Sequence, residues 1–228
     1  MIENKRKFYT GLGLMAAFVV VLIIFFSPVF RGQNGLDYLD NLYNSISKGS
    51  AYYIPKLRDE IQPFKGDQVA VNLKMANDEQ AEQTSRLLKA GGAEVVQEAS
   101  QLNVSGDLGM ILDNCLVDAD AMYENNGSKV SGKYGYEERV ALYNWWKASK
   151  EMEKSLQKQK RFKEAEVVSL ILKKAVETSY NYYKIEPQNI SDKVWIVLLS
   201  LVFYVVYTMW YGFAFMFMFE GWGMKLEH

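Results

Sequence analysis

Residues 194–219, VWIVLLSLVFYVVYTMWYGFAFMFMF, form an uncharged run near the end of the 228-residue chain. A helix needs about 20 predominantly apolar residues to cross the hydrocarbon core of a bilayer, so this run is long enough to span it with some tilt. Trp195 and Trp222, near the two ends of the run, match the aromatic belts found at membrane surfaces. We therefore predict a transmembrane helix over residues 194–219.

A second uncharged run, FYTGLGLMAAFVVVLIIFFSPVF, covers residues 8–30 and meets the same length requirement. Lys5, Arg6 and Lys7 before it also fit the start of a secretory signal peptide. However, the exit FFSPVFRG lacks the small-x-small pattern of a cleavage site, and the apolar run is longer than that of a typical signal peptide. The sequence therefore predicts an uncleaved signal anchor that crosses the membrane over residues 8–30.

The basic residues around the first run predict an orientation. Three of them precede it, whereas only Arg31 follows it immediately, and cytoplasmic flanks carry the excess of Lys and Arg. Residues 1–7 are therefore expected in the cytoplasm, together with residues 220–228 after two crossings. Residues 31–193 would lie outside the cytoplasm, in the periplasm of a bacterial inner-membrane protein. Residues 226–228, Leu-Glu-His, resemble the scar of a vector-encoded tag.

Both predicted spans carry a candidate packing face. On the second, a stripe of hydroxyl-bearing side chains repeats at helical spacing and consists of Ser200, Tyr204, Tyr207 and Tyr211. Hydroxyl groups in hydrocarbon need hydrogen-bond partners, so we expect this stripe to meet another helix. On the first, Gly13 and Ala17 form a small-xxx-small pair. That pair fits packing of the two spans, but equally self-association or docking onto a larger membrane complex.

The amino-acid composition argues against several classes of function. Lys and Arg number 26 and Asp and Glu number 27, so no net field favours nucleic acid. The single His is His228, within the tag-like end, which leaves no imidazole for metal binding or acid–base catalysis. A lone Cys115 cannot form an intrachain disulfide or a CxxC motif. We predict a protein that is not an enzyme, with no catalytic residue, no cofactor and no metal site.

One acidic cluster resembles the opening of a calcium-binding loop. Asp118-x-Asp120 begins like an EF-hand, but Met122 occupies the next ligand position and the following glycine is missing. The cluster is therefore predicted to be a solvated acidic helix face.

The segment between the spans begins with short helices. Leu39, Leu42 and Ile46 share one helical face and Gly49 follows as a stop, which predicts a membrane-proximal helical segment over residues 31–65. From residue 66 the period changes, because Val69 and Val71 begin an alternation of apolar and polar residues that is typical of a strand.

Asn77 and Gln80 then predict a helix start, and the Gly91-Gly92 pair predicts its end. Residues 93–99 and 101–106 predict two further strands, and residues 107–123 a second helix. The order βαββα predicts a small ferredoxin-like α/β domain over residues 66–124, with its helices on one face of the sheet.

In this order of elements, residues 67–115 resemble the peptidoglycan-binding SPOR domains, whose chain also runs from a strand through a helix with a glycine-ended turn to a hairpin. The resemblance is one of architecture, and no glycan-binding residue transfers with it. It implies glycan as an alternative partner.

Residues 125–136 are rich in Asn, Gly, Ser and charge and predict a loop. Residues 137–193 predict a helical segment, either a hairpin or one long helix over residues 137–184, because no Gly or Pro interrupts its middle. Trp145 and Trp146 point about 100° apart on a helix. Both could be packed internally, or one could be core and the other an interaction residue.

The sequence therefore predicts a membrane-anchored α+β protein with two transmembrane helices flanking the extracytoplasmic part. The predicted function is a non-catalytic accessory or scaffold subunit that binds other membrane-protein subunits. The alternatives are a self-associating envelope or sensor-type protein that binds a periplasmic ligand or peptidoglycan, and a quinone-linked enzyme subunit.

Overall fold

The computed structural model describes residues 2–30 and 32–224. They form two compact units: one contains the two ends of the chain, up to Gly49 and from Pro187, and the other runs from Ser50 to Glu186. The chain is mostly helical, with one three-stranded sheet and an apolar helix near each terminus. The predicted α+β composition with two long apolar helices is confirmed at this level. The tag-like residues 226–228 and Arg31 lie outside the described residues.

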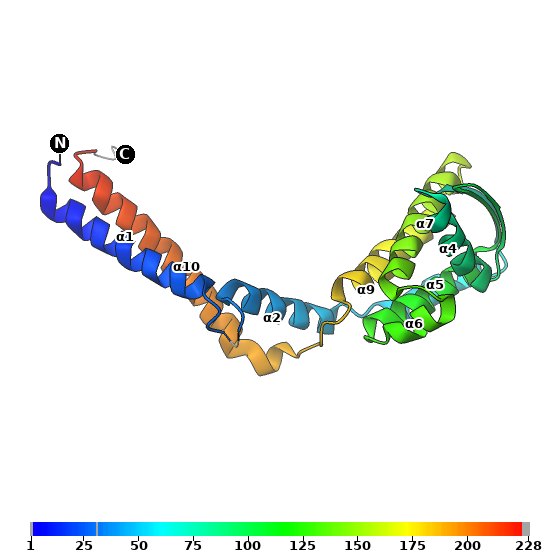
Figure 1. The fold of residues 1–228 in the computed structure, drawn as a ribbon, viewed down its shortest axis with the longest axis horizontal. Helices are drawn as coiled ribbons and strands as arrows, with labels where there is room; N and C mark the ends of the chain where they lie inside the picture. The colour runs from blue at the N-terminus through cyan, green and yellow to red at the C-terminus, as the bar shows by residue number, and fades with distance from the viewer. Residues whose placement is uncertain (1, 31, 225–228) are drawn as a thin grey trace. The chain divides into compact units, whose positions relative to one another are not determined.

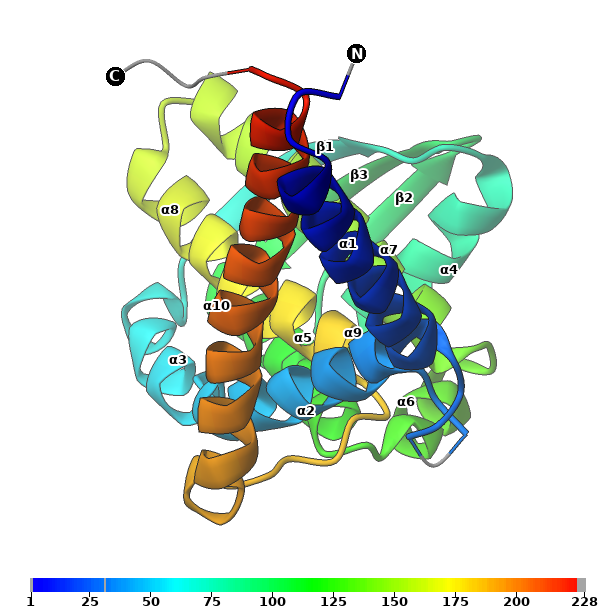
Figure 2. The same cartoon turned by 90° about the vertical axis from the view of Figure 1, so that its left-hand side faces the viewer.

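In the first unit, α1 (Lys5–Phe26) and α10 (Ile190–Gly221) run side by side in opposite directions (Figures 1 and 2). Both are long and apolar enough to cross a membrane, by length and composition. Aromatic rings fill much of their contact: Phe18 stacks on Tyr207 with ring centroids 4.6 Å apart, and Phe25 stacks on Phe203 at 5.7 Å.

The helix ends differ from the predicted spans. Helix α1 stops at Phe26 rather than Phe30, because Pro28 disfavours helical backbone at Ser27. Helix α10 extends beyond both ends of the predicted 194–219, starting at Ile190 and ending at Gly221. The polar residues before Val194 form the first turn of the helix, where the backbone N–H groups have no intrahelical acceptor and donate to other groups or to water.

Helix α2 (Gly35–Ser50) follows the end of α1. Gly35 lies against the ring of Phe25, where a Cβ atom would come within 2.4 Å of the ring, so no larger residue fits without a shift. The hydroxyls of Tyr43 in α2 and Ser200 in α10 are hydrogen-bonded at 2.6 Å.

The second unit begins with α3 (Ile54–Glu60) and a short 3-10 turn (Gln62–Phe64). It continues with β1 (Gln68–Lys74), α4 (Asp78–Ala90), β2 (Glu94–Glu98), β3 (Gln101–Asp107) and α5 (Leu108–Tyr123), which is the predicted βαββα order. The strand order is β1-β3-β2, with β3 antiparallel to both neighbours (Figure 2). Strand β1 alternates buried and exposed residues along its whole length, as its sequence predicts.

Helix α4 begins at the position that the sequence predicts, with Asn77 as its N-cap residue. The Asn77 side chain accepts from the backbone N–H of Gln80 at 2.8 Å, and the Gln80 side chain accepts from Ala76 N–H at 2.9 Å. This reciprocal pairing satisfies two backbone donors at the helix start. Helix α5 begins with an N-cap bond, in which Asp107 accepts from Met110 N–H at 3.1 Å.

The prediction of a loop over residues 125–136 is wrong, because this region contains α6 (Gly127–Tyr134). Its sequence has weak helix propensity, but Val130 and Tyr134 are buried against the neighbouring helices. Tertiary packing of these side chains therefore stabilises a helix that local propensity alone would not form. Gly135 ends the helix at φ 78°, a left-handed conformation that favours glycine.

The helical segment after α6 is a hairpin and not one long helix. Helix α7 (Glu138–Lys158) ends before α8 (Phe162–Ile171), with Lys160 at φ 63° between them. Backbone N–H groups of Lys160 and Arg161 donate to the carbonyls of Gln157 and Leu156, both at 3.0 Å. This is a Schellman motif made without glycine. A π-helical turn (Leu172–Val176) and α9 (Glu177–Tyr182) follow, and residues 183–189 are not helical, contrary to the predicted extent of 137–193.

The sheet and the hairpin share one hydrophobic core, so residues 66–124 and the hairpin belong to one unit rather than to separate modules. The turn after α7 also covers the free edge of β1. Gln159 Nε2 donates to Ala70 O at 2.8 Å, and Arg161 Nη1 donates to Gln68 O at 2.7 Å. Side chains thus bind the backbone groups that an additional strand would otherwise use.

Candidate functional site

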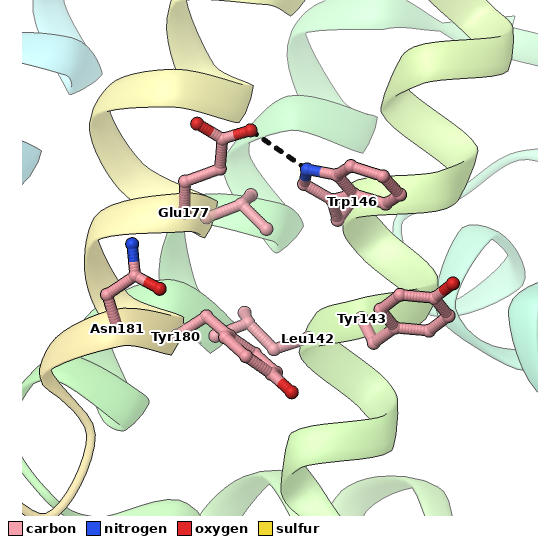
Figure 3. Close-up of a pocket in the computed structure, with 7 residues that line it drawn as sticks. Leu142, Tyr143, Trp146, Glu177, Tyr180 and Asn181 are labelled. Atoms are coloured by element: carbon pink, nitrogen blue, oxygen red, sulfur yellow. Dashed lines mark hydrogen bonds between the residues drawn. The ribbon is translucent and has the colours of Figure 1, made fainter.

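A cleft lies between α7 and the π-helical turn with α9, and we call it the aromatic cleft (Figure 3). Its volume is about 320 Å³, and its lining residues are Leu142, Tyr143, Trp146, Val176, Glu177, Tyr180 and Asn181. Helix α7 contributes most of the aromatic surface, whereas α9 contributes the carboxylate and the amide. Its size is near the lower end of typical ligand sites, about 300–1,000 Å³.

Trp146 is held in place from both helices. Its indole Nε1–H donates to Glu177 Oε1 at 2.9 Å, as Figure 3 shows, and its ring stacks on Tyr143 with centroids 5.6 Å apart and planes 19° apart. The ammonium of Lys150 lies 3.9 Å from the ring centroid of Trp146. The half-buried indole is therefore a fixed wall of the cleft rather than a mobile surface side chain.

Trp145 has a different role, although it adjoins Trp146 in sequence. It is 2% exposed, and its Nε1–H donates to the buried carboxylate of Asp118 at 2.8 Å. Asp118 also accepts from the Tyr134 hydroxyl at 2.5 Å and from Lys133 Nζ at 2.8 Å. Of the alternatives left open by the sequence, the structure has Trp145 in the core and Trp146 half-buried at a cleft.

Contacts beyond the cleft fix the end of α9. The Tyr183 hydroxyl donates to Glu138 Oε1 at 2.7 Å, and the guanidinium of Arg139 lies over the rings of Tyr180 and Tyr183 at 5.9 and 5.7 Å. Burial and the bond to Glu138 raise the pKa of Tyr183 to about 12, and the same bond holds the pKa of Glu138 below its ordinary value. The hydroxyl therefore stays a donor across the ordinary pH range.

Several polar groups of the cleft have no hydrogen-bond partner among the described residues. These are Glu177 Oε2, the side-chain amide of Asn181, and the hydroxyls of Tyr143 and Tyr180. They leave acceptors and donors available next to aromatic surface. A carboxylate beside an amide and two hydroxyls can bind a ligand through charge and hydrogen bonds.

The predicted hydroxyl stripe on α10 is divided among different surroundings. Ser200 meets Tyr43, and Tyr207 stacks on Phe18 of α1, with Tyr211 also near that ring at 5.5 Å. Tyr204 is 67% exposed. The stripe therefore meets α2 at Ser200 and α1 at Tyr207 and Tyr211, and it leaves Tyr204 exposed.

Gly11 of α1 and Gly221 of α10 lie in the contact between the two long helices, whereas Gly13 of the small-xxx-small pair does not. A Cβ atom on Gly11 would come within 2.7 Å of Met218 N and 2.8 Å of Ala214 O, whereas one on Gly13 would meet nothing within 4 Å. Gly13 and Ala17 are exposed on α1. They do not contribute to packing of α1 on α10.

The acidic residues around α5 are engaged in ion pairs and hydrogen bonds. Arg58 pairs with Asp113 at 3.2 Å and with Asp120 at 3.5 Å, and Asp120 also accepts from Tyr52 at 2.8 Å. Within the described ranges, no group of three His, Cys, Asp or Glu side chains is placed to hold a metal ion. Only part of the cluster is the solvated face that the sequence predicted, since Asp118 is buried.

Sequence reasoning identified Trp146 but missed the rest of the cleft. Tyr143 precedes Trp146 by three residues, and Tyr180 and Asn181 follow Glu177 by three and four, so each set shares one helical face. That spacing could have indicated two polar–aromatic faces, but not that they oppose each other.

Comparison with protein families, curated proteins and solved structures finds no match to this chain. The cleft is therefore interpreted from its own geometry.

Proposed function

We propose that the protein is a non-catalytic accessory subunit of a bacterial inner-membrane complex. In this proposal α1 and α10 span the membrane, both termini are cytoplasmic, and residues 50–186 lie on the periplasmic side. The aromatic cleft is the surface that contacts a partner protein.

The surface of α10 supports the membrane placement. Its large apolar side chains are exposed, including Leu199 at 73% and Trp195 at 82%. Soluble monomers rarely expose a continuous apolar surface of this kind, whereas lipid covers it at no cost. Lys7 and Glu220 pair at 2.7 Å where the two helices meet near the termini, close to the basic residues expected on the cytoplasmic side.

The docking role rests on one observation: the structure holds Trp146 rigidly beside unpaired polar groups in an open cleft. Interface hot spots are enriched in Trp and Tyr, and a preorganised aromatic side chain loses little entropy on binding. Tyr143 and Tyr180 add further aromatic surface, at 48% and 39% exposure.

A second candidate function is a self-associating envelope protein. The exposed Gly13 and Ala17 pair on α1 favours it, because close approach of a second helix needs small residues on a free face. A ferredoxin-like, SPOR-like domain that binds peptidoglycan belongs to this alternative and rests on the order of elements alone. A quinone-linked subunit is less favoured, since the tyrosine stripe does not line one common surface.

Crosslinking in the native host, followed by mild solubilisation and mass spectrometry, tests the proposal. A membrane-complex subunit recovered in constant proportion to this chain, and lost with Trp146→Ala but retained with the exposed Glu166→Ala, is the expected result. Recovery of the chain only as a homo-oligomer would contradict it and favour the second candidate.

A further inference from the structure

We infer that the aromatic cleft binds a lysine side chain of the partner protein. This inference rests on the proposed function, because it names the chemical group by which the partner would dock.

The charge of the cleft points to a cation. Glu177 is the single charged residue among those that line it, and the other polar lining residues are neutral. Tyr143, Trp146 and Tyr180 line the same cleft, and aromatic faces attract ammonium and guanidinium groups. Two of these rings already make cation–π contacts within the chain, because Lys150 lies over Trp146 and Arg139 lies over Tyr180.

The arrangement of apolar and polar groups matches a long aliphatic side chain with a charged end. Leu142 and Val176 give the cleft an apolar wall, while Glu177 and Asn181 add polar groups one helical turn apart on α9 (Figure 3). The methylene stem of a lysine would cover Leu142 and Val176, and its ammonium would donate to the Glu177 carboxylate.

The geometry favours lysine over arginine. Glu177 Oε1 already accepts from the Trp146 indole at 2.9 Å, so Oε2 is the carboxylate oxygen that has no partner within the described part of the chain. Arginine recognises carboxylates best through two parallel hydrogen bonds, whereas the lysine ammonium is a point charge that needs a single oxygen.

Lys150 of the chain itself competes with the ligand. Its ammonium lies 3.9 Å from the Trp146 ring centroid and places a like charge beside the ring. Replacing it by glutamine should remove both competition and repulsion. Lys150→Gln is therefore expected to bind lysine more tightly, while Glu177→Gln, which keeps an oxygen acceptor for the indole but loses the charge, is expected to bind it more weakly.

The test uses the full chain in detergent micelles and three probes: N-acetyl-lysine methylamide, its norleucine analogue and its arginine analogue. The indole N–H resonance of Trp146, assigned with Trp146→Phe, reports binding. We expect the lysine amide to shift this resonance with an affinity about fivefold higher than that of the norleucine amide, a modest ratio because the cleft is open to water. Equal affinities for lysine and norleucine amides, or a tighter arginine amide, would overturn the assignment.

Variants make the test specific. Glu177→Gln should reduce lysine-amide affinity about fivefold, to the norleucine level, Lys150→Gln should increase it, and the exposed Glu166→Gln on α8 should leave it unchanged. An unchanged affinity in Glu177→Gln would also reject the lysine site.

The inference and the proposed function can fail separately. If a partner co-purifies but its contact peptide binds equally well after Lys→Gln substitution, the docking function stands and the lysine assignment fails. If the lysine amide binds but no partner co-purifies, the partner as the source of the lysine is rejected together with the docking function.

Discussion

The indole N–H of Trp145 in α7 donates to the buried carboxylate of Asp118 in α5 at 2.8 Å. The same carboxylate accepts from Tyr134 at the end of α6 and from Lys133. One side chain thus connects three helices, and it supports the half of the aromatic cleft that α7 provides.

Asp118→Asn should destabilise the protein by about 2–3 kcal/mol, because an amide places N–H groups where three donors already point. Denaturant unfolding followed by near-UV circular dichroism measures this. The matched variant Asp120→Asn affects a more exposed carboxylate and should cost less than about 1 kcal/mol. Similar losses for the two variants would reject Asp118 as the central acceptor.

Burial raises the pKa of Tyr136 to about 12 from an ordinary 10.0, and its hydroxyl donates to Gln83 O at 3.0 Å. The folded state therefore keeps this proton at a pH where the unfolded chain has lost it. The resulting stability is complete below about pH 10 and is lost as the pH rises towards 12. Tyr136→Phe should make the alkaline fall in the free energy of unfolding less steep. Identical alkaline profiles for the two proteins would contradict this.

Gly11→Leu should separate α1 from α10, since a Cβ atom there lies 2.7 Å from backbone at Met218. Trp210 provides the readout, because its indole N–H donates to Leu14 O at 3.0 Å across the helix pair. The Trp210 indole resonance should move in Gly11→Leu and stay in place in Gly13→Leu. If the Gly13 variant moved the resonance equally, the observed packing face of α1 would be wrong.

Cys115 is fully buried, and burial raises its thiol pKa well above the ordinary value, so it should not react with a membrane-impermeant maleimide. Single cysteines added at exposed positions can therefore report topology directly. In intact spheroplasts, Glu166→Cys should label, whereas Glu3→Cys should label only after the membrane is permeabilised. The reverse pattern would invert the proposed orientation.

The sequence was informative where local chemistry decides the structure. Alternation from Val69 marks β1, and the spacing of Asn77 and Gln80 marks the start of α4, because each depends on near neighbours. The end of α7 could not be predicted, since Lys160 adopts a left-handed conformation that its own type disfavours. Helix α6 was missed because burial of Tyr134, not propensity, stabilises it.

The candidate site was less predictable than the fold. Gly11 and Gly13 look alike in sequence, and only the direction of α10 selects Gly11 for the contact. Trp146 meets Glu177 because the hairpin after α7 returns α9 to its side, a tertiary contact that neither helical pattern encodes.

Site-specific photocrosslinking in the native host tests the docking role most directly. With a photoreactive amino acid at Tyr180 in the aromatic cleft, we predict one dominant adduct to another membrane-complex subunit. The same group at the exposed Glu166 on α8 should give no such adduct. Adducts at Tyr180 only to a second copy of this chain, or equal adducts at both positions, would contradict the account.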